Sequence, residues 1–440
     1  MSGRTGIEPL RGTAGRAESA FVLKARAVLP TLCFSLLIFV AFVAFSPVFT
    51  GDYGTEEALA GGGDSARQIG FVALFVAVAL STVLTRGAGA LLDVPLALAV
   101  LLLWCWASIA WAIEPAVSFR RVLFTTIVAL SVTYSVRMLP PRAVVAIAFT
   151  WFAAILAADW LVMPFVAHAV HQPGELDTAL VGNWRGVHPH KNEAGAFCAI
   201  AALVFIHTAV KGGSFITAPI AAALALVFLA LTASKTSGGL FVVAAVAGVL
   251  IEAAYRNPGL RKVAFAVGLC VLLAVLNVSG DIGERLAATF DDPSSLTGRV
   301  QIWPVLLRYA SDNLLFGSGY GSFWAIGTSS PVAEGGTGWL SLISHAHNGY
   351  LDLLVQTGLI GVTLAVLGFV VHPARILLTR PLPPGAPRWL LGAVLTFCWL
   401  HNVLETSLLD RANIVWVMVL IAYNMLERRP PARAGAGPGT

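Results

Sequence analysis

About a dozen long apolar runs constrain what this chain can fold into more than any other feature of its sequence. A helix that crosses a lipid bilayer needs about 20 mostly apolar residues. The runs lie at about 27–49, 69–84, 92–113, 122–136, 143–165, 192–210, 216–232, 240–254, 263–279, 349–371, 389–408 and 412–426. Only 12% of the 440 residues are charged, against about 25% in soluble proteins. The sequence therefore predicts an all-α polytopic membrane protein with about 12 transmembrane helices, and it excludes a set of soluble domains.

The distribution of Lys and Arg predicts how the chain is oriented. Cytoplasmic loops of membrane proteins carry an excess of these residues, and both the leader, residues 1–26, and the tail, residues 427–440, are rich in Arg. We therefore place both termini in the cytoplasm, which requires an even number of spans, and expect the tail to be disordered. The net charge of +5 then reflects orientation in the membrane, and no nucleic-acid partner is expected.

The spacing of the runs divides the chain into two groups of spans. Nine spans fall within residues 27–279 and three within 349–426. The long segment between them, 280–348, is expected to be a large extracytoplasmic loop between spans 9 and 10. Its centre, Leu296–Asp312, has the pattern of an amphipathic helix interrupted by Pro304.

Four acidic residues lie near the outward ends of predicted spans: Asp159, Glu193, Asp352 and Glu405. Ionisable residues in or beside a span are costly and often functional. For any one of them a place at a helix end is the simpler interpretation. Four at the same face favour a polar cavity that opens to the outside.

Cations and imidazoles gather in Gly182–Asn192, the densest polar stretch that precedes a span. This stretch contains Arg185, His188, His190 and Lys191. Two cations and two histidines just above the outer face predict an anion site, and the alternative is a solvated loop that binds lipid headgroups.

Two short segments that contain glycine are interpreted as turns. Ser234–Gly239 would hold Lys235 close to the membrane surface, where its ammonium group either pairs with an anion or simply snorkels. The glycines of Phe316–Gly321 serve tight turns, because the strand that precedes a nucleotide-binding glycine loop is missing. Arg299 lies between these two segments, and its guanidinium group suits phosphate recognition.

A third polar segment, Ser344–Tyr350, closes the long loop and contains His345 and His347. With His188 and His190 it provides two His-x-His pairs on one side of the membrane. Alternate residues of an extended chain share a face, so the pairs can ligate zinc. The alternative is that one His acts as a general base, since the imidazole pKa is naturally near working pH.

The segment that begins at His347 also carries a family resemblance. His347-Asn348, followed by nine residues and then Gly358-Leu359-Ile360-Gly361, resembles the H-[NSQ]-x9-G-x-x-G pattern of the O-antigen ligase and Wzy-type polysaccharide polymerase family. The order of the other polar segments is similar too, over roughly residues 180–425. The resemblance implies a bacterial inner-membrane protein with about 12 spans and a large loop before the motif.

Residue by residue, the resemblance implies that His347 is catalytic and that Arg185 and Arg299 hold a lipid-linked pyrophosphate. Lys235 lies where family members usually have Ser-Arg, which keeps the charge but loses the guanidinium fork, and Lys191 adds a further cation. Supporting or acceptor-binding roles are expected for seven polar residues: His190, Asn192, His345, Asn348, Asp352, Glu405 and Asp159. Of these, Glu405 and Asp159 are the two candidates for an acid that orients His347.

The chemistry that the resemblance implies is glycosyl transfer at the periplasmic face. The donor is a saccharide on undecaprenyl pyrophosphate, and His347 deprotonates the acceptor hydroxyl, which attacks the anomeric carbon with inversion. No metal or other cofactor is expected. The stretch around Arg185 most resembles ExoQ-type exopolysaccharide polymerases. Expected partners are the lipid-linked oligosaccharide, the acceptor glycan, membrane lipids, and chain-length-regulating and export proteins.

Three other functions stay open at this point. An O-antigen ligase would transfer the glycan to the lipid A-core, and the motif does not separate it from a polymerase. A polysaccharide flippase would place its substrate site near the membrane midplane, whereas the candidate residues crowd the outer face. A zinc-dependent membrane hydrolase would use the two His-x-His pairs.

Overall fold

The fold is helical throughout the part of the chain that the computed structural model describes. The described residues are 28–46, 65–173, 180–263, 299–332, 345–411 and 413–428, except the side chains of 299–301. Among them the only strand-like feature is an isolated bridge between Val170 and Trp184. The α-helices are Val28–Phe42, α4 (Ser65–Arg86), α5 (Leu96–Ala107), α6 (Pro115–Arg137), α7 (Pro141–Val162), α8 (Lys191–Val210), α9 (Thr217–Leu231), α10 (Lys235–Arg256), α12 (Arg299–Asp312), α14 (Gly349–Val366), α15 (His372–Thr379), α16 (Arg388–Leu404) and α17 (Ile414–Leu426). Short 3-10 turns are η1 (Ala88–Leu92), η2 (Ser108–Trp111), η3 (Ala167–Ala169) and η5 (Gly327–Ser329), and η7 (Leu367–Val371) is a π-helical turn.

Each predicted span that falls within the described residues coincides with a helix. In that part of the chain, six helices are long and apolar enough to cross a membrane, and five more are apolar but shorter. The ninth predicted span, 263–279, lies outside the described residues except for its first residue, as do the whole leader and most of the tail. The prediction of an all-α membrane protein is therefore supported, and the number of 12 spans stays a prediction.

The outer surface of the bundle is apolar, as a lipid environment requires. Along α4 the large side chains that face outward are Ile69, Val72, Val76, Leu80 and Leu84, which are 44% to 69% exposed. The opposite face of the same helix is also apolar and buries its side chains among its neighbours. A helix that is apolar on both its buried and its exposed face belongs in a membrane, so the chain is a membrane protein.

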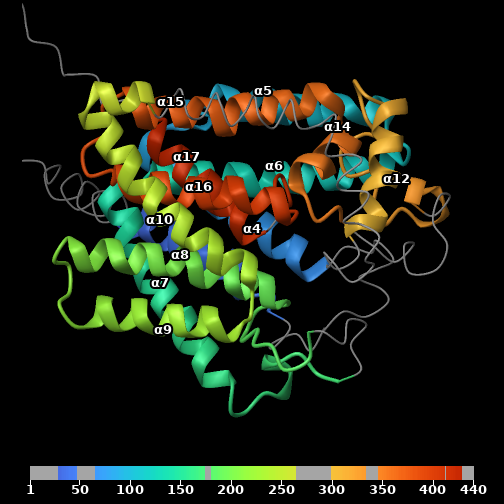
Figure 1. Cartoon of the computed structure of the whole chain (residues 1–440). Helices are drawn as coiled ribbons and strands as arrows, with labels where there is room; N and C mark the ends of the chain where they lie inside the picture. The colour runs from blue at the N-terminus through green and yellow to red at the C-terminus, as the bar shows by residue number, and fades with distance from the viewer. Residues whose placement is uncertain are drawn as a thin grey trace, which may run out of the picture.

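Helices α8 and α17 form the centre of the bundle (Figure 1). Every residue of α17 from Ile414 to Leu426 is buried, and so is most of α8. Helix α17 packs against α6 and α16, while α8 packs against α7, α9 and α10. Helix α12 lies at one end of the bundle beside α14 (Figure 1). It is the predicted amphipathic helix, and Pro304 lies inside it.

The segment after α12 packs against the helices. Residues 316–325, here called the glycine loop, belong to the predicted extramembrane segment 280–348, and within them Ser322 and Phe323 are fully buried. Gly317, Gly319 and Gly321 have φ angles of 66°, 86° and 69°, which confirms the prediction of turn glycines. This backbone can enter because glycine tolerates positive φ and close contacts, and because helix side chains accept its N–H groups.

The structure corrects the turn expected at Ser234–Gly239. Ser234 is the N-cap residue of α10, and Lys235 is the first residue of that helix. The helix therefore begins about one turn earlier than the apolar run suggested, because Lys235 and Thr236 are tolerated in a first helical turn.

Candidate functional site

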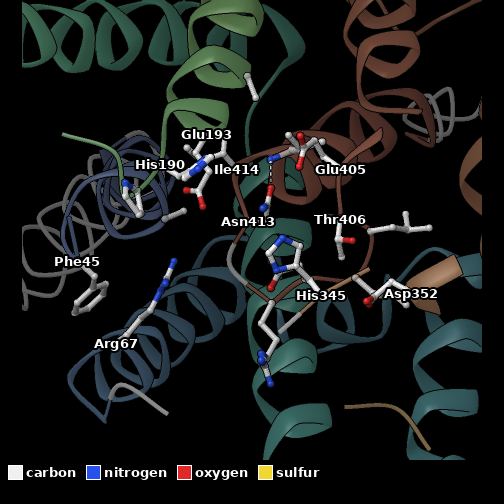
Figure 2. Close-up of a pocket in the computed structure, with 18 of the residues that line it drawn as sticks. Phe45, Arg67, His190, Glu193, His345, Asp352, Glu405, Thr406, Asn413 and Ile414 are labelled. Atoms are coloured by element: carbon white, nitrogen blue, oxygen red, sulfur yellow. Dashed lines mark hydrogen bonds between the residues drawn. The ribbon is translucent and has the colours of Figure 1, made fainter. Parts of the chain in front are cut away.

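A cavity of about 710 Å³ opens among the helix ends at one end of the bundle. Side chains from α4, α6, α8, α14, α17, the glycine loop and the turn between α16 and α17 line it. In the view of Figure 2, Arg67, His190 and Glu193 lie to the left in the cavity, and Glu405 and Asp352 lie to the right. Of the four acids predicted to lie together, Glu193, Asp352 and Glu405 contribute to this lining.

His347 lies in the cavity wall immediately before α14. Asn348 is the N-cap residue of that helix, and its side-chain oxygen accepts the N–H groups of Tyr350 and Leu351 at 3.0 Å each. His347 has a φ of 51°, in the left-handed region that side chains other than glycine rarely adopt. Asn348 therefore fixes where α14 begins, and the conformation of His347 is set by what holds its neighbours.

Glu405 is the acid next to His347. One carboxylate oxygen lies 3.5 Å from Nδ1 of His347, and the other accepts a hydrogen bond from the amide of Asn192 at 2.9 Å. Asp159 lies elsewhere, fully buried, where its carboxylate accepts the N–H of Val187 at 3.0 Å and lies 3.4 Å from His188 Nε2. Of the two candidates for the orienting acid, the structure therefore brings Glu405 to His347.

Ser234 extends this arrangement to a fourth helix. Its hydroxyl donates to Asn192 Oδ1 at 3.4 Å, so Ser234, Asn192, Glu405 and His347 form a line of polar contacts. Gly195 permits the approach, because a Cβ there would lie 2.7 Å from the Ser234 Cβ. We call these four residues the polar relay; sequence reasoning named the last three but missed Ser234.

Arginines also line the cavity: Arg67, Arg120, Arg121 and Arg411. Arg121 is buried and donates to the carbonyls of Gly321, Trp324 and Ala325 at 2.6, 2.7 and 3.1 Å, so it secures the glycine loop. Sequence reasoning missed all four. A signal was present, because Arg67 and Arg120–Arg121 precede spans on the same predicted face as the acids.

Three of the four cations that the sequence singled out, Arg185, Lys191 and Lys235, do not line this cavity. Arg185 is buried and donates to the carbonyls of His168 and Pro189 at 2.7 and 3.3 Å. Lys191 is absent from the lining, and Lys235 lies on a separate groove of about 360 Å³ formed by α9 and α10. The side chain of Arg299 lies outside the described residues.

The histidines do not assemble into a metal site in the described part of the chain, where no three His, Cys, Asp or Glu side chains have a metal-binding arrangement. His190 instead caps α8, and its Nδ1 accepts the N–H of Asn192 at 3.2 Å. Burial, together with the neighbouring ring of His171, lowers the pKa of His190 to about 4. His345 lies against His347, with ring centroids 4.2 Å apart.

The two glycines that complete the motif allow backbone and side chains to approach α14. Gly358 has a φ of 67°, and a Cβ there would lie 2.1 Å from the carbonyl oxygen of Leu315, just before the glycine loop. A Cβ at Gly361 would lie 2.0 Å from the Thr357 hydroxyl and 3.1 Å from the indole of Trp104. The motif thus joins a helix start that carries His347 to the point where the glycine loop enters the bundle.

Residues 220–366 match the model of the O-antigen ligase family, and no curated protein matches the chain. The matched residues include Ser234, the glycine loop and the motif from His347 to Gly361, while Asn192 and Glu405 lie outside them. This match to the O-antigen ligase family model over about a third of the chain supports the resemblance that the His347 motif indicated.

Proposed function

We propose that this protein is a membrane glycosyltransferase that transfers or polymerises saccharide units from an undecaprenyl-pyrophosphate-linked donor. The observation that carries this proposal is the pairing of His347 with Glu405 in the wall of a cavity that arginines line. Glycosyl transfer from a pyrophosphate requires a base for the acceptor hydroxyl and positive charge for the leaving group. The cavity offers both.

His347 is the proposed base. Its Nδ1 faces Glu405, which leaves Nε2 to take the proton from the acceptor hydroxyl. The hydroxyl oxygen then forms a bond to the anomeric carbon from the face opposite the leaving group. The bond between that carbon and the pyrophosphate oxygen breaks, and the electron pair leaves with the pyrophosphate, so the configuration inverts. Glu405 stabilises the imidazolium that forms, and no metal or other cofactor takes part.

The donor pyrophosphate is proposed to bind the arginines of the cavity. Arg67, Arg120 and Arg411 line it, and guanidinium groups suit pyrophosphate because they bind two oxygens at once. Arg299 stays a predicted donor contact from the start of α12. Arg185, Lys191 and Lys235 are less suited, because they do not contribute to the lining of this cavity.

The proposed location is the bacterial inner membrane, with the cavity at the periplasmic face and both termini in the cytoplasm. Exopolysaccharide or O-antigen polymerisation is the favoured reaction. A ligase that transfers the glycan to the lipid A-core would use the same geometry. The partners are then the acceptor glycan, membrane lipids, and proteins that regulate chain length or export the product.

The test is glycan analysis of a deletion strain that expresses the wild-type chain, His347→Ala or His372→Ala. His372 pairs with Glu427 away from the cavity lining and serves as the matched control. A polymerase predicts loss of high-mass polysaccharide with single repeat units retained in the deletion strain and with His347→Ala, and full restoration with His372→Ala. Polymer left on its carrier lipid would indicate a ligase, and normal elongation with His347→Ala would refute the proposed base.

A further inference from the structure

Both peptide groups that flank Ala346, the residue before His347, are held by side chains. The Ala346 carbonyl accepts a hydrogen bond from the indole Nε1–H of Trp303 in α12 at 2.9 Å. The Ala346 N–H donates to the carboxylate of Asp352 at 3.2 Å. Ala346 itself is fully buried. The backbone that leads into His347 is therefore fixed from two different helices.

Asp352 receives two further donors. The indole of Trp324 donates to it at 2.7 Å, and the Gln356 amide donates to it at 2.5 Å. The carbonyl oxygen of the same Gln356 amide accepts the N–H of Gly321 at 2.8 Å. With three donors on a buried carboxylate, Asp352 ties the glycine loop to the segment of His347, and its hydrogen-bonding capacity is largely used for that purpose.

His347 needs such support because its backbone is left-handed. A residue other than glycine keeps this conformation only where the surrounding structure holds it. On the other side of His347, the N–H of Asn348 donates to the Thr406 hydroxyl at 3.2 Å and the N–H of Gly349 donates to the Glu405 carbonyl at 3.1 Å. The segment is thus held from both directions, with the imidazole ring between the two sets of contacts.

We propose that Asp352 and Trp303 are positioning residues for His347, and that they hold its imidazole against Glu405 through the two peptide groups of Ala346. This inference rests on the proposed function, in which His347 is the base. It assigns Asp352 to the backbone rather than to an acceptor sugar. It also makes the docking of α12 a condition for catalysis, because the Trp303 contact reaches Ala346 from that helix.

The test compares purified Trp303→Phe and Asp352→Asn with the wild type in lipid vesicles. The donor is the polyprenyl-pyrophosphate-linked oligosaccharide extracted from the deletion strain. Each variant is expected to lower kcat by about tenfold to a hundredfold, because displacing a reacting group by about 1 Å has an effect of that size. The KM for the donor should stay within about twofold. Trp399→Phe is the matched control, since it removes a 2.7 Å indole–carbonyl hydrogen bond to Phe369 within the bundle.

A second substitution tests whether the hydrogen bonds themselves matter. Asp352→Asn leaves two amide groups facing each other, and adding Gln356→Glu restores an acceptor for the new amide while it still accepts the Gly321 N–H. The double variant is therefore expected to recover most of the lost kcat. Failure of this recovery would overturn the assignment of Asp352.

The rate at which diethyl pyrocarbonate modifies His347, followed by mass spectrometry, adds a measurement that needs no substrate. Trp303→Phe and Asp352→Asn should change this rate severalfold, and Trp399→Phe should not. If His347→Ala is inactive while both variants keep wild-type kcat and modification rate, the positioning role is wrong and the proposed base stands. If His347→Ala stays active, the proposed function fails, and the modification rates alone decide whether the two residues position His347.

Discussion

Replacing Glu405 by Gln would remove the negative charge beside His347 while it keeps the shape of the side chain. The amide oxygen of the new side chain can face His347, and its amide can bind Asn192 once that residue turns its own amide over. Asn192 then donates toward the Ser234 hydroxyl, which accepts as readily as it donates. The polar relay is thus preserved, and charge is the main difference between the two proteins.

The size of the effect follows from the 3.5 Å distance between the carboxylate oxygen and His347 Nδ1. At an effective dielectric constant of about 20, two unit charges at this distance interact by roughly 5 kcal/mol. The side chains of His347 and Glu405 are 29% and 11% exposed, so water reduces this attraction, and about 2–3 kcal/mol is a reasonable remainder. Because the imidazolium forms as the acceptor loses its proton, kcat should fall by about 30-fold to 150-fold.

The assay is the initial rate of glycan elongation by purified protein in vesicles at saturating donor, with the KM for donor measured in parallel. Glu427→Gln is the control, because Glu427 forms a carboxylate–imidazole pair with His372 that takes no part in the cavity lining. It should leave kcat unchanged. A Glu405→Gln enzyme that keeps at least half of the wild-type kcat would refute the role of the Glu405 charge. A fall in donor affinity alone would place Glu405 in donor binding.

Three further predictions concern the cavity, the motif and pH. Arg120→Ala should raise the KM for the donor by about tenfold to a hundredfold, and by more than Lys235→Ala does, because of these two residues only Arg120 lines the cavity. Equal effects on the KM would contradict donor binding in the cavity. Gly358→Ala should lower the free energy of unfolding by at least about 2 kcal/mol, measured by thermal unfolding in detergent, since its Cβ would lie 2.1 Å from a carbonyl oxygen. Gly238→Ala is the control and should leave the free energy of unfolding unchanged, because its Cβ meets open space. The pKa of His190 is lowered to about 4 from 6.5, so on acidification the unfolded chain takes up the proton on this residue before the folded chain does, and up to about 3 kcal/mol of stability should be lost as pH falls from 6.5 to 4. The unfolding midpoints of His190→Asn at pH 7.5, 5.5 and 4.5 should therefore depend less on pH than those of the wild type, and an unchanged dependence would contradict the assignment.

The sequence was sufficient to predict the features that depend on local pattern. Apolar runs indicate helices in a membrane whatever their arrangement, because each span must satisfy its own backbone. The turn glycines of the glycine loop are likewise a property of a few neighbouring residues. Even the gathering of Glu193, Asp352 and Glu405 at one cavity followed from counting spans, since the count decides which ends lie at the same face.

Features that depend on the direction of a side chain were beyond the sequence. Lys235 and Ser234 are adjacent and both line the separate groove of α9 and α10, yet of the two only Ser234 also reaches Asn192. The rotation of α10 about its axis decides this difference. Arg185 and Arg121 are both cations near the predicted outer face, yet both are buried and bind backbone carbonyls. No spacing rule separates an arginine that binds a ligand from one that secures a loop.

If His347 acts as proposed, the polar relay extends the site beyond the matched residues 220–366. Ser234 and His347 lie within that match, but the two residues that connect them, Asn192 and Glu405, come from helices on either side of it. The connection also depends on Gly195, outside the match, which lets α8 approach the start of α10. A Cβ at Gly195 would push Ser234 away from Asn192, and the loss would reach His347 only through Glu405. The position of His347 therefore depends on α8 and α16, which lie outside the matched residues, and a substitution on α8 should alter the proposed chemistry of His347 without touching the motif itself.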